Sequence, residues 1–165
     1  MNMKKMSTII VAMLSVFILL PNAMAASSEV TWTSPEKYRD IHPGEENKKR
    51  FQERVMKNLE EHILKLAEKL PEGQSIKMNV TDVDLAGDVN HGSIHRVRVV
   101  KDLYFPRMKF EYELVSSDGK TIDKGEVDLK DMNFLRTGHL KYRTDSLGHE
   151  KKMLDDWFKD TFMRS

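Results

Sequence analysis

The sequence contains no cysteine among its 165 residues. Disulfide bonds, thiol nucleophiles and lipid anchors on cysteine are therefore excluded, and the fold must be stabilised by packing. The motifs of the nucleophile elbow, the glycine-rich phosphate loop and the His-Glu-x-x-His zinc helix are also missing. A pair of glycosidase acids would have to come from 26 carboxylates, and no spacing singles one out. The sequence thus favours a protein that is not an enzyme, and it contains no motif that indicates a cofactor.

The chain also lacks an excess of charge of either sign. It has 27 basic and 26 acidic residues, and without the first 25 residues the balance is 25 to 26. Proteins that bind nucleic acids or anionic membranes through electrostatic attraction carry a clear positive surplus. We therefore expect no nucleic-acid partner and no strongly electrostatic membrane contact.

The longest apolar run, from Ile9 to Leu20, has the features of a signal peptide. Lys4 and Lys5 precede it, and Ala23-Met24-Ala25 follows it with small residues where signal peptidase cleaves. As a helix the run would span roughly 18 Å, short of the bilayer core of about 30 Å. We interpret residues 1–25 as a signal peptide that leaves no stable membrane anchor after cleavage. Residues 26–165 then form one domain with one hydrophobic core.

The exported part alternates between two hydrophobic periods. Alternation of apolar and polar residues predicts strands at residues 29–33, 76–85, 96–100, 108–114 and 120–129, with a short sixth strand at residues 139–143. Steps of three and four residues predict helices from about residue 46 to 70 and from about 147 onward. This order predicts an α+β fold: a mainly antiparallel sheet of about five strands with two helices on one face. The first strand should lie parallel to the strand after the long helix.

Two details of the strands can be predicted more closely. The apolar parity changes near Thr81-Asp82, which indicates a β-bulge. Asp118-Gly119 predicts a two-residue hairpin turn. The register that follows places Phe110 opposite Val127 on an apolar face, and Lys109 opposite Asp128 on a charged face.

Six strings, in this order along the chain, carry a family resemblance. They are Val30-Thr31-Trp32, Pro35-Glu36-Lys37-Tyr38-Arg39-Asp40, Leu70-Pro71-Glu72-Gly73-Gln74, Val83-Asp84-Leu85-Ala86-Gly87, Arg98-Val99-Val100 and Glu150-Lys151-Lys152-Met153-Leu154-Asp155-Asp156-Trp157-Phe158. Nearly all of the exported part resembles the bacterial domain-of-unknown-function family 3016, whose members are mostly predicted exported proteins of Gram-negative bacteria. The resemblance implies a periplasmic location, and it implies no activity, ligand or site residue.

The region from Asp82 to His95 contains the candidate metal ligands. Asp82 and Asp84 share a strand face, and Asp88, His91 and His95 follow in a polar loop. Carboxylates and imidazoles are ligands for zinc and copper, so these residues are candidates for a metal site.

Cross-strand ion pairs are the competing interpretation of the same acids, and we favour it. A loop centred on Asn90 would place Asp84 opposite Arg96 and Asp82 opposite Arg98. Carboxylates held by arginines are poor metal ligands, because their charge is already engaged. Gly87, at the end of this strand, is expected to adopt a backbone conformation that other residues disfavour.

Two functional hypotheses follow. The first is a noncatalytic binding or accessory module of the bacterial cell envelope, with an envelope protein or component as partner. Its binding surface would be the charged sheet face or the connection at residues 130–146, with Trp32, Tyr38 and Arg143 as candidate interaction residues. The alternative for Trp32 and Tyr38 is that they pack on the sheet edge. The alternative is a metal-binding or metal-dependent hydrolytic protein that uses the Asp82–His95 region.

The signal-peptide interpretation makes a direct prediction. The intact mass of protein isolated from the bacterial periplasm should correspond to a chain that starts at Ala26. A mass that retains residues 1–25, in protein recovered with membranes, would instead show that the apolar segment is an uncleaved anchor.

Overall fold

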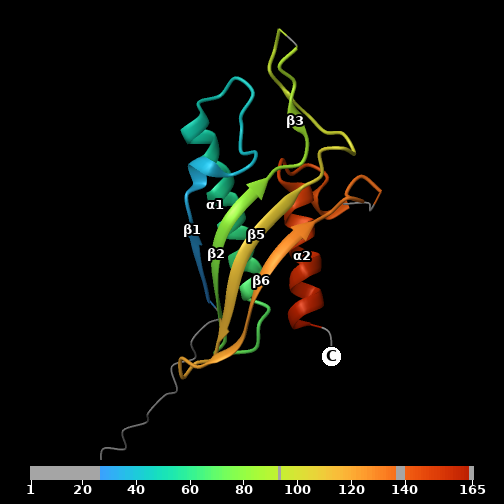
Figure 1. The fold of residues 1–165 in the computed structure, drawn as a ribbon. Helices are drawn as coiled ribbons and strands as arrows, with labels where there is room; N and C mark the ends of the chain where they lie inside the picture. Colours follow the sequence, from blue (N-terminus) through green and yellow to red (C-terminus); the bar gives the residue numbers. More distant parts are fainter. Residues whose placement is uncertain (1–26, 93, 137–139, 164–165) are drawn as a thin grey trace, which may run out of the picture.

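The computed structural model describes residues 27–92, 94–136 and 140–163; the predicted signal peptide, residues 1–25, lies outside them. A four-stranded sheet has the strand order β1-β2-β5-β6, and two helices lie along one of its faces (Figure 1). The sheet strands are β1 Ser27–Trp32, β2 Ser75–Asp84, β5 Arg107–Val115 and β6 Thr121–Lys130, and the helices are α1 Lys48–Ala67 and α2 Gly148–Phe162. The predicted α+β class is confirmed.

The pairing of the strands follows the predicted topology. β1 lies parallel to β2, and β5 lies antiparallel to both β2 and β6. Because α1 connects β1 to β2, the chain crosses over the sheet through a helix, as a parallel connection requires. The N-terminus of α1 is capped by Asn47, whose side chain accepts a hydrogen bond from the Arg50 N–H at 3.1 Å.

Two of the predicted strands are not part of this sheet. Within residues 96–100, only β4 Arg98–Val99 is a strand, and it pairs with the short β3 Asp88–Val89 in a separate two-stranded ribbon. The ribbon projects beyond one end of the sheet (Figure 1). In the described part of residues 139–143, the chain forms a turn of 3-10 helix at Leu140–Tyr142 instead of a sixth strand.

The predicted hairpin register is confirmed. Phe110 opposes Val127 and Lys109 opposes Asp128, and the predicted bulge occurs in β2 between Val80 and Asp82. The turn is wider than the predicted two residues, because the Ser116 N–H donates to the carbonyl of Lys120. A second bulge, between Leu114 and Val115 in β5, accommodates this wider turn without changing the register further along the strands.

The core lies between the sheet and the two helices. Phe110 of β5 is fully buried, and its ring meets the Trp157 ring of α2 edge to face with 4.7 Å between centroids. Leu59, Leu66, Met108, Phe110 and Phe158 are buried in one cluster, and Phe51 and Trp157 are partly buried against it. In the described part of the chain, no helix is both long enough and apolar enough to span a bilayer.

The two helices are also joined by a polar contact. His62 of α1 is 7 % exposed, and its Nε2 lies 2.9 Å from Asp155 Oδ1 and 3.1 Å from the Lys151 carbonyl oxygen, both on α2. Both partners are acceptors, so Nε2 carries the proton and donates. Burial lowers the pKa of His62 despite the neighbouring Asp155 carboxylate, so the imidazole is neutral at neutral pH. A directional bond thus fixes how α1 lies against α2.

Phe110→Ala tests the assignment of the sheet faces. Truncation of a fully buried aromatic ring at the sheet–helix interface should cost roughly 3–5 kcal/mol in the free energy of unfolding. Urea denaturation measures this loss, and Ile122→Ala on the exposed side of β6 provides the control. A loss below about 1 kcal/mol for Phe110→Ala would mean that this face of β5 does not form the core.

Candidate functional site

The candidate site is built around the end of β2 and the turn that follows it. Val83 and Leu85 are buried, and Asp84 between them points to the other side of the strand. The segment at Asp40 runs parallel to this strand end: its N–H donates to the Val83 carbonyl at 3.2 Å, and the Leu85 N–H donates to its carbonyl at 3.1 Å. Gly87 then turns the chain with a φ of 83°. This left-handed conformation favours glycine and confirms the prediction.

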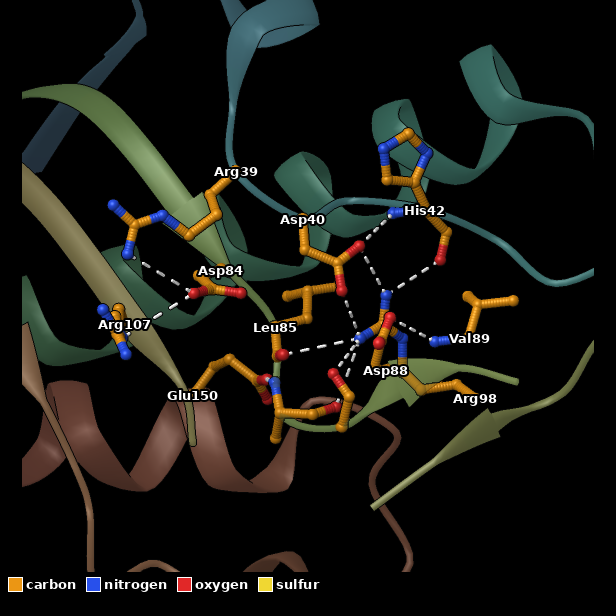
Figure 2. Close-up of polar contacts among 12 residues, drawn as sticks. Arg39, Asp40, His42, Asp84, Leu85, Asp88, Val89, Arg98, Arg107 and Glu150 are labelled. Atoms are coloured by element: carbon orange, nitrogen blue, oxygen red, sulfur yellow. Dashed lines mark hydrogen bonds and ion pairs between the residues drawn. The ribbon is translucent and has the colours of Figure 1, made fainter. Parts of the chain in front are cut away.

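Arg98 of β4 attaches the ribbon to this strand end (Figure 2). Its two terminal nitrogens form a two-pronged ion pair with the Asp40 carboxylate, with both distances at 3.0 Å. Nη1 also donates to the Gly87 carbonyl at 2.7 Å, and Nη2 donates to the His42 carbonyl at 2.9 Å. Bidentate arginine–carboxylate pairs are strong and directional. The guanidinium therefore fixes the strand end, the turn and the ribbon in one arrangement.

The predicted ion pair between Asp84 and Arg96 is wrong. Asp84 opposes Arg107 of β5, and its carboxylate lies 3.7 Å from Arg107 Nε and 3.8 Å from Arg39 Nη1. Figure 2 shows Asp84 between these two side chains. Burial raises the pKa of Asp84, although both guanidinium groups act in the opposite direction. Asp84 is thus held by Arg107 and Arg39 instead of the predicted Arg96.

The predicted pairing of Asp82 with Arg98 is wrong for the same structural reason. Asp82 opposes Lys109, and its carboxylate accepts a hydrogen bond from the Arg39 N–H at 2.8 Å. The turn at Gly87 carries the chain out of the sheet, so β2 pairs directly with β5 and the ribbon has a register of its own. In that ribbon Arg98 opposes Val89.

The remaining metal-ligand candidates are only partly brought together. Asp84, Asp88 and His91 border one polar groove of about 310 Å³, whereas His95 is not among its lining residues. The Asp88 carboxylate accepts a hydrogen bond from the Val89 N–H at 2.7 Å, and the exposed His95 has its Nδ1 3.4 Å from a Glu45 carboxylate oxygen. Within the described residues, no three histidine, aspartate or glutamate side chains gather in a geometry that would hold a metal ion.

A second cavity, of about 300 Å³, lies where α1, α2 and the turn after β2 meet. Its apolar walls include Phe51 and Val55 of α1 and Leu147 at the start of α2, and its polar groups include Arg98 and Glu150. Ligand-binding cavities typically combine such apolar walls with a few fixed polar groups. We call this space the Glu150 cavity.

Glu150 is 2 % exposed, which is rare for a carboxyl group. Its Oε1 accepts a hydrogen bond from the Ala86 N–H at 2.7 Å. Within the described residues, its buried Oε2 has no hydrogen-bond partner, and neither has the buried Nε of Arg98. A buried polar atom without a partner costs stability. Two residues that line the cavity, Glu150 and Arg98, thus each contain one buried polar atom without a hydrogen-bond partner among the described residues.

Burial also raises the pKa of Glu150, while the Ala86 N–H and the positive charge of Arg98 act in the opposite direction. The carboxyl group can thus be a neutral hydrogen-bond donor, or a carboxylate when a positive charge lies beside it. Both states are suited to ligand recognition.

Sequence reasoning did not identify Glu150 as a site residue. A signal for it exists, because Glu150 has helical spacing from Leu147, Leu154 and Phe158, which are all buried. An acid on the apolar stripe of a helix must find a partner or a function inside the fold. That rule, applied to α2, singles out Glu150.

The three predicted interaction residues have different environments. Tyr38 is buried, its hydroxyl donates to the Val80 carbonyl at 2.7 Å, and burial raises its pKa to about 12. Its ring belongs to the core and is not part of the exposed surface. Trp32 is partly buried and donates from its indole nitrogen to Glu60. Arg143 is exposed, in the turn that follows residues 140–142.

Comparison with known proteins identifies the family of the chain. The family model described as "Protein of unknown function (DUF3016)" matches residues 26–160. No curated protein and no solved structure shows a significant match. The matched range contains all residues that line the Glu150 cavity.

Glu150→Gln tests the environment of this carboxyl group, because it removes the charge and keeps the shape. The pKa of Glu150 is higher in the folded protein than its ordinary value. The stability due to the protonated form is therefore fully present below about pH 4 and lost as the pH rises through the raised value. The Tm of the variant minus that of the wild type should therefore be larger at pH 8 than at pH 4. We expect this difference to grow by at least about 3 °C, or roughly 1 kcal/mol.

The control for this measurement is Asp156→Asn, which removes a carboxylate from an exposed position of the same helix. Asp156 forms an ion pair with Lys152, so the control should show no such gain at the higher pH. Calorimetric melting at both pH values measures the difference. A Glu150→Gln effect that is the same at both pH values would contradict the raised pKa.

Proposed function

The chain belongs to the DUF3016 family of proteins of unknown function, and on that premise we propose that it is a noncatalytic binding module of the bacterial cell envelope that holds a small ligand in the Glu150 cavity. The observation that carries this proposal is the buried carboxyl group of Glu150, which lines the cavity and has one oxygen without a hydrogen-bond partner among the described residues. An acid in a protein core lowers stability unless something pairs with it. A ligand would supply that partner.

The size of the cavity defines the class of ligand. A volume of about 300 Å³ is at the lower end of ligand-binding sites and equals the volume of about ten water molecules in the liquid. A compound with on the order of ten non-hydrogen atoms fits this space. The ligand is therefore a small molecule, and the proposed partner is a soluble component of the envelope.

Binding without catalysis agrees with the chemistry of the site. Arg98 is held by Asp40 and by backbone carbonyls, so its guanidinium is fixed in place. Glu150 is held through its Oε1 by the Ala86 N–H. Fixed donors and acceptors are suited to recognition, and the sequence carries no motif of a nucleophilic enzyme. The metal-dependent alternative has no comparable support, because the acids that it requires are engaged by arginines and backbone N–H groups.

The envelope location is supported by the signal-peptide features of residues 1–25. In the periplasm of a Gram-negative bacterium, such a module would meet nutrients and breakdown products that pass the outer membrane. A small binding cavity suits that setting.

Ser146→Phe tests whether the cavity is used. Ser146 is exposed at the edge of the cavity, so a phenyl ring there should block the entrance without disturbing the core. Thr144→Phe adds the same ring at an exposed position outside the lining. Native mass spectrometry of protein purified gently from the periplasm should show a small bound molecule in the wild type and in Thr144→Phe, and its loss in Ser146→Phe. The same bound molecules in all three, or none in any of them, would contradict the proposed function.

A further inference from the structure

We infer that the polar groove beside Asp84 is a second binding site, distinct from the Glu150 cavity, and that it takes a phosphate group through Arg39 and Arg107. The chemistry shared by its ligands is a phosphate, whether on a small soluble molecule or in a lipid headgroup. The inference comes from the placement of the two arginines, from their hydrogen-bond donors and from the charge around them.

Arg39 and Arg107 meet at one end of the polar groove. Both are among its lining residues, although they come from the segment before Asp40 and from the first position of β5. Arg39 Nη1 lies 3.8 Å and Arg107 Nε lies 3.7 Å from the same atom, Asp84 Oδ2. Figure 2 shows both side chains turned toward Asp84. The two guanidinium groups are therefore neighbours.

A ligand in the groove can reach these side chains. The Arg39 side chain is 50 % exposed and that of Arg107 is 31 % exposed. Arg107 Nε itself is buried, so Arg39 offers the larger share of accessible donors. The Arg107 guanidinium lies over the Phe105 ring, with its Cζ 4.2 Å from the ring centroid. This stacking fixes the second positive charge in place.

The contacts with Asp84 leave N–H donors available on both arginines. The distances of 3.7 and 3.8 Å exceed the roughly 3 Å of an N–H···O hydrogen bond. Asp84 therefore holds the two guanidinium groups by charge without taking their hydrogen bonds. A guanidinium presents a planar fork of donors that matches the oxygens of a phosphate.

The charge at this end of the groove favours an anion. Arg39 and Arg107 carry two positive charges against the one negative charge of Asp84 between them. Asp82 lies 4.0 Å from Arg39, but it opposes Lys109 on β5, which supplies a further positive charge. One positive charge is thus left over at the two arginines.

The other two acids of the groove do not remove this excess. Asp40 is neutralised by its ion pair with Arg98. The Asp88 carboxylate accepts a hydrogen bond from the Val89 N–H at 2.7 Å, and Figure 2 shows its side chain beside Arg98, away from the two lining arginines.

Phosphate fits this arrangement better than a carboxylate does. A phosphate monoester carries nearly two negative charges at neutral pH and has three acceptor oxygens. A carboxylate has one charge and two oxygens, which a single guanidinium fork occupies. A phosphate therefore uses both arginines. The volume of about 310 Å³ also leaves room for a small organic group on the phosphate.

The test is titration calorimetry of the mature protein at neutral pH and low ionic strength, with inorganic phosphate, glycerol 3-phosphate and acetate as probes. We expect at least one of the two phosphates to bind at least ten times more tightly than acetate. Arg39→Gln should weaken phosphate binding at least tenfold, because charge-assisted hydrogen bonds are lost. Arg39→Lys keeps the charge but not the fork, so its affinity should lie in between. Arg50→Gln, at an exposed position of α1 outside the groove, should bind like the wild type.

A vesicle assay separates the two sources of phosphate. Cosedimentation with vesicles that contain phosphatidic acid, but not with pure phosphatidylcholine vesicles, and its loss in Arg39→Gln would identify a lipid headgroup as the source. Binding of glycerol 3-phosphate in solution without binding to these vesicles would identify a soluble phosphate. If neither form binds, if acetate binds as tightly as phosphate, or if Arg39→Gln keeps full affinity, the inference is wrong.

The place of binding can be measured without a variant. In NMR spectra of the wild type, the phosphate probe should shift the amide signal of Gly87, which lines the groove, and leave that of Asn58, which lines only the Glu150 cavity. Shifts at Asn58 without shifts at Gly87 would overturn the inference even if Arg39→Gln failed to fold. Because His42 borders both spaces, Ser146→Phe is the further control, and it should leave phosphate binding unchanged. The groove and the Glu150 cavity can thus each fail their test without the other.

Discussion

The ion pair between Arg98 and Asp40 is the contact on which this end of the molecule depends. Asp40 is bonded through its backbone to the end of β2, and Arg98 lies in the ribbon, so the pair joins segments that are distant in sequence. Taking two charges out of water is costly unless their geometry is good and their remaining hydrogen bonds are satisfied. Here both hydrogen bonds between the Arg98 guanidinium and the Asp40 carboxylate are 3.0 Å long, and backbone carbonyls accept hydrogen bonds from most of the remaining N–H groups of Arg98. The exception is Nε, which is buried without an acceptor among the described residues.

A close backbone contact supports the same arrangement. The loop at Gly44 approaches the start of the ribbon so closely that a Cβ atom at this position would lie 1.5 Å from the Arg96 carbonyl oxygen. Any side chain there would push the ribbon away from the loop. Pro43 and Gly44 also line the Glu150 cavity, so this contact shapes one of its walls.

The Glu150 cavity also depends on the contact between the helices. Phe51 and Val55 come from α1, and Leu147 and Glu150 come from the start of α2, so the shape of the cavity follows the placement of one helix on the other. His62 and Asp155 fix that placement with a directional bond at 2.9 Å. The fold thus holds a buried acid in a well-defined space at a cost to its own stability. Local violations of packing rules in an otherwise consistent fold tend to mark functional positions.

The local parts of this architecture could be predicted from the pattern of apolar and polar residues. The helix at Lys48–Ala67, the bulge after Val80 and the register of Phe110 opposite Val127 all follow from periodicities of two or of three to four residues. These periods report which side of an element faces the core. The family could also be predicted from the sequence, since the strings that carry the resemblance lie within residues 26–160, which the family model matches.

By itself, then, the sequence determined the class of the fold, the order of the two helices and the four strands of the main sheet, the register of the hairpin, and the family. Only the tertiary structure decided the site. Arg98 meets Asp40 across 58 positions of the chain, and Glu150 meets Ala86 across 64. The predicted partners of Asp82 and Asp84 were wrong because the turn at Gly87 removes the ribbon from the sheet. A periodic pattern shows whether a residue is buried or exposed. The partner of a charged group, however, depends on which residues the folded chain places beside it, and a local sequence pattern contains no information about such distant contacts.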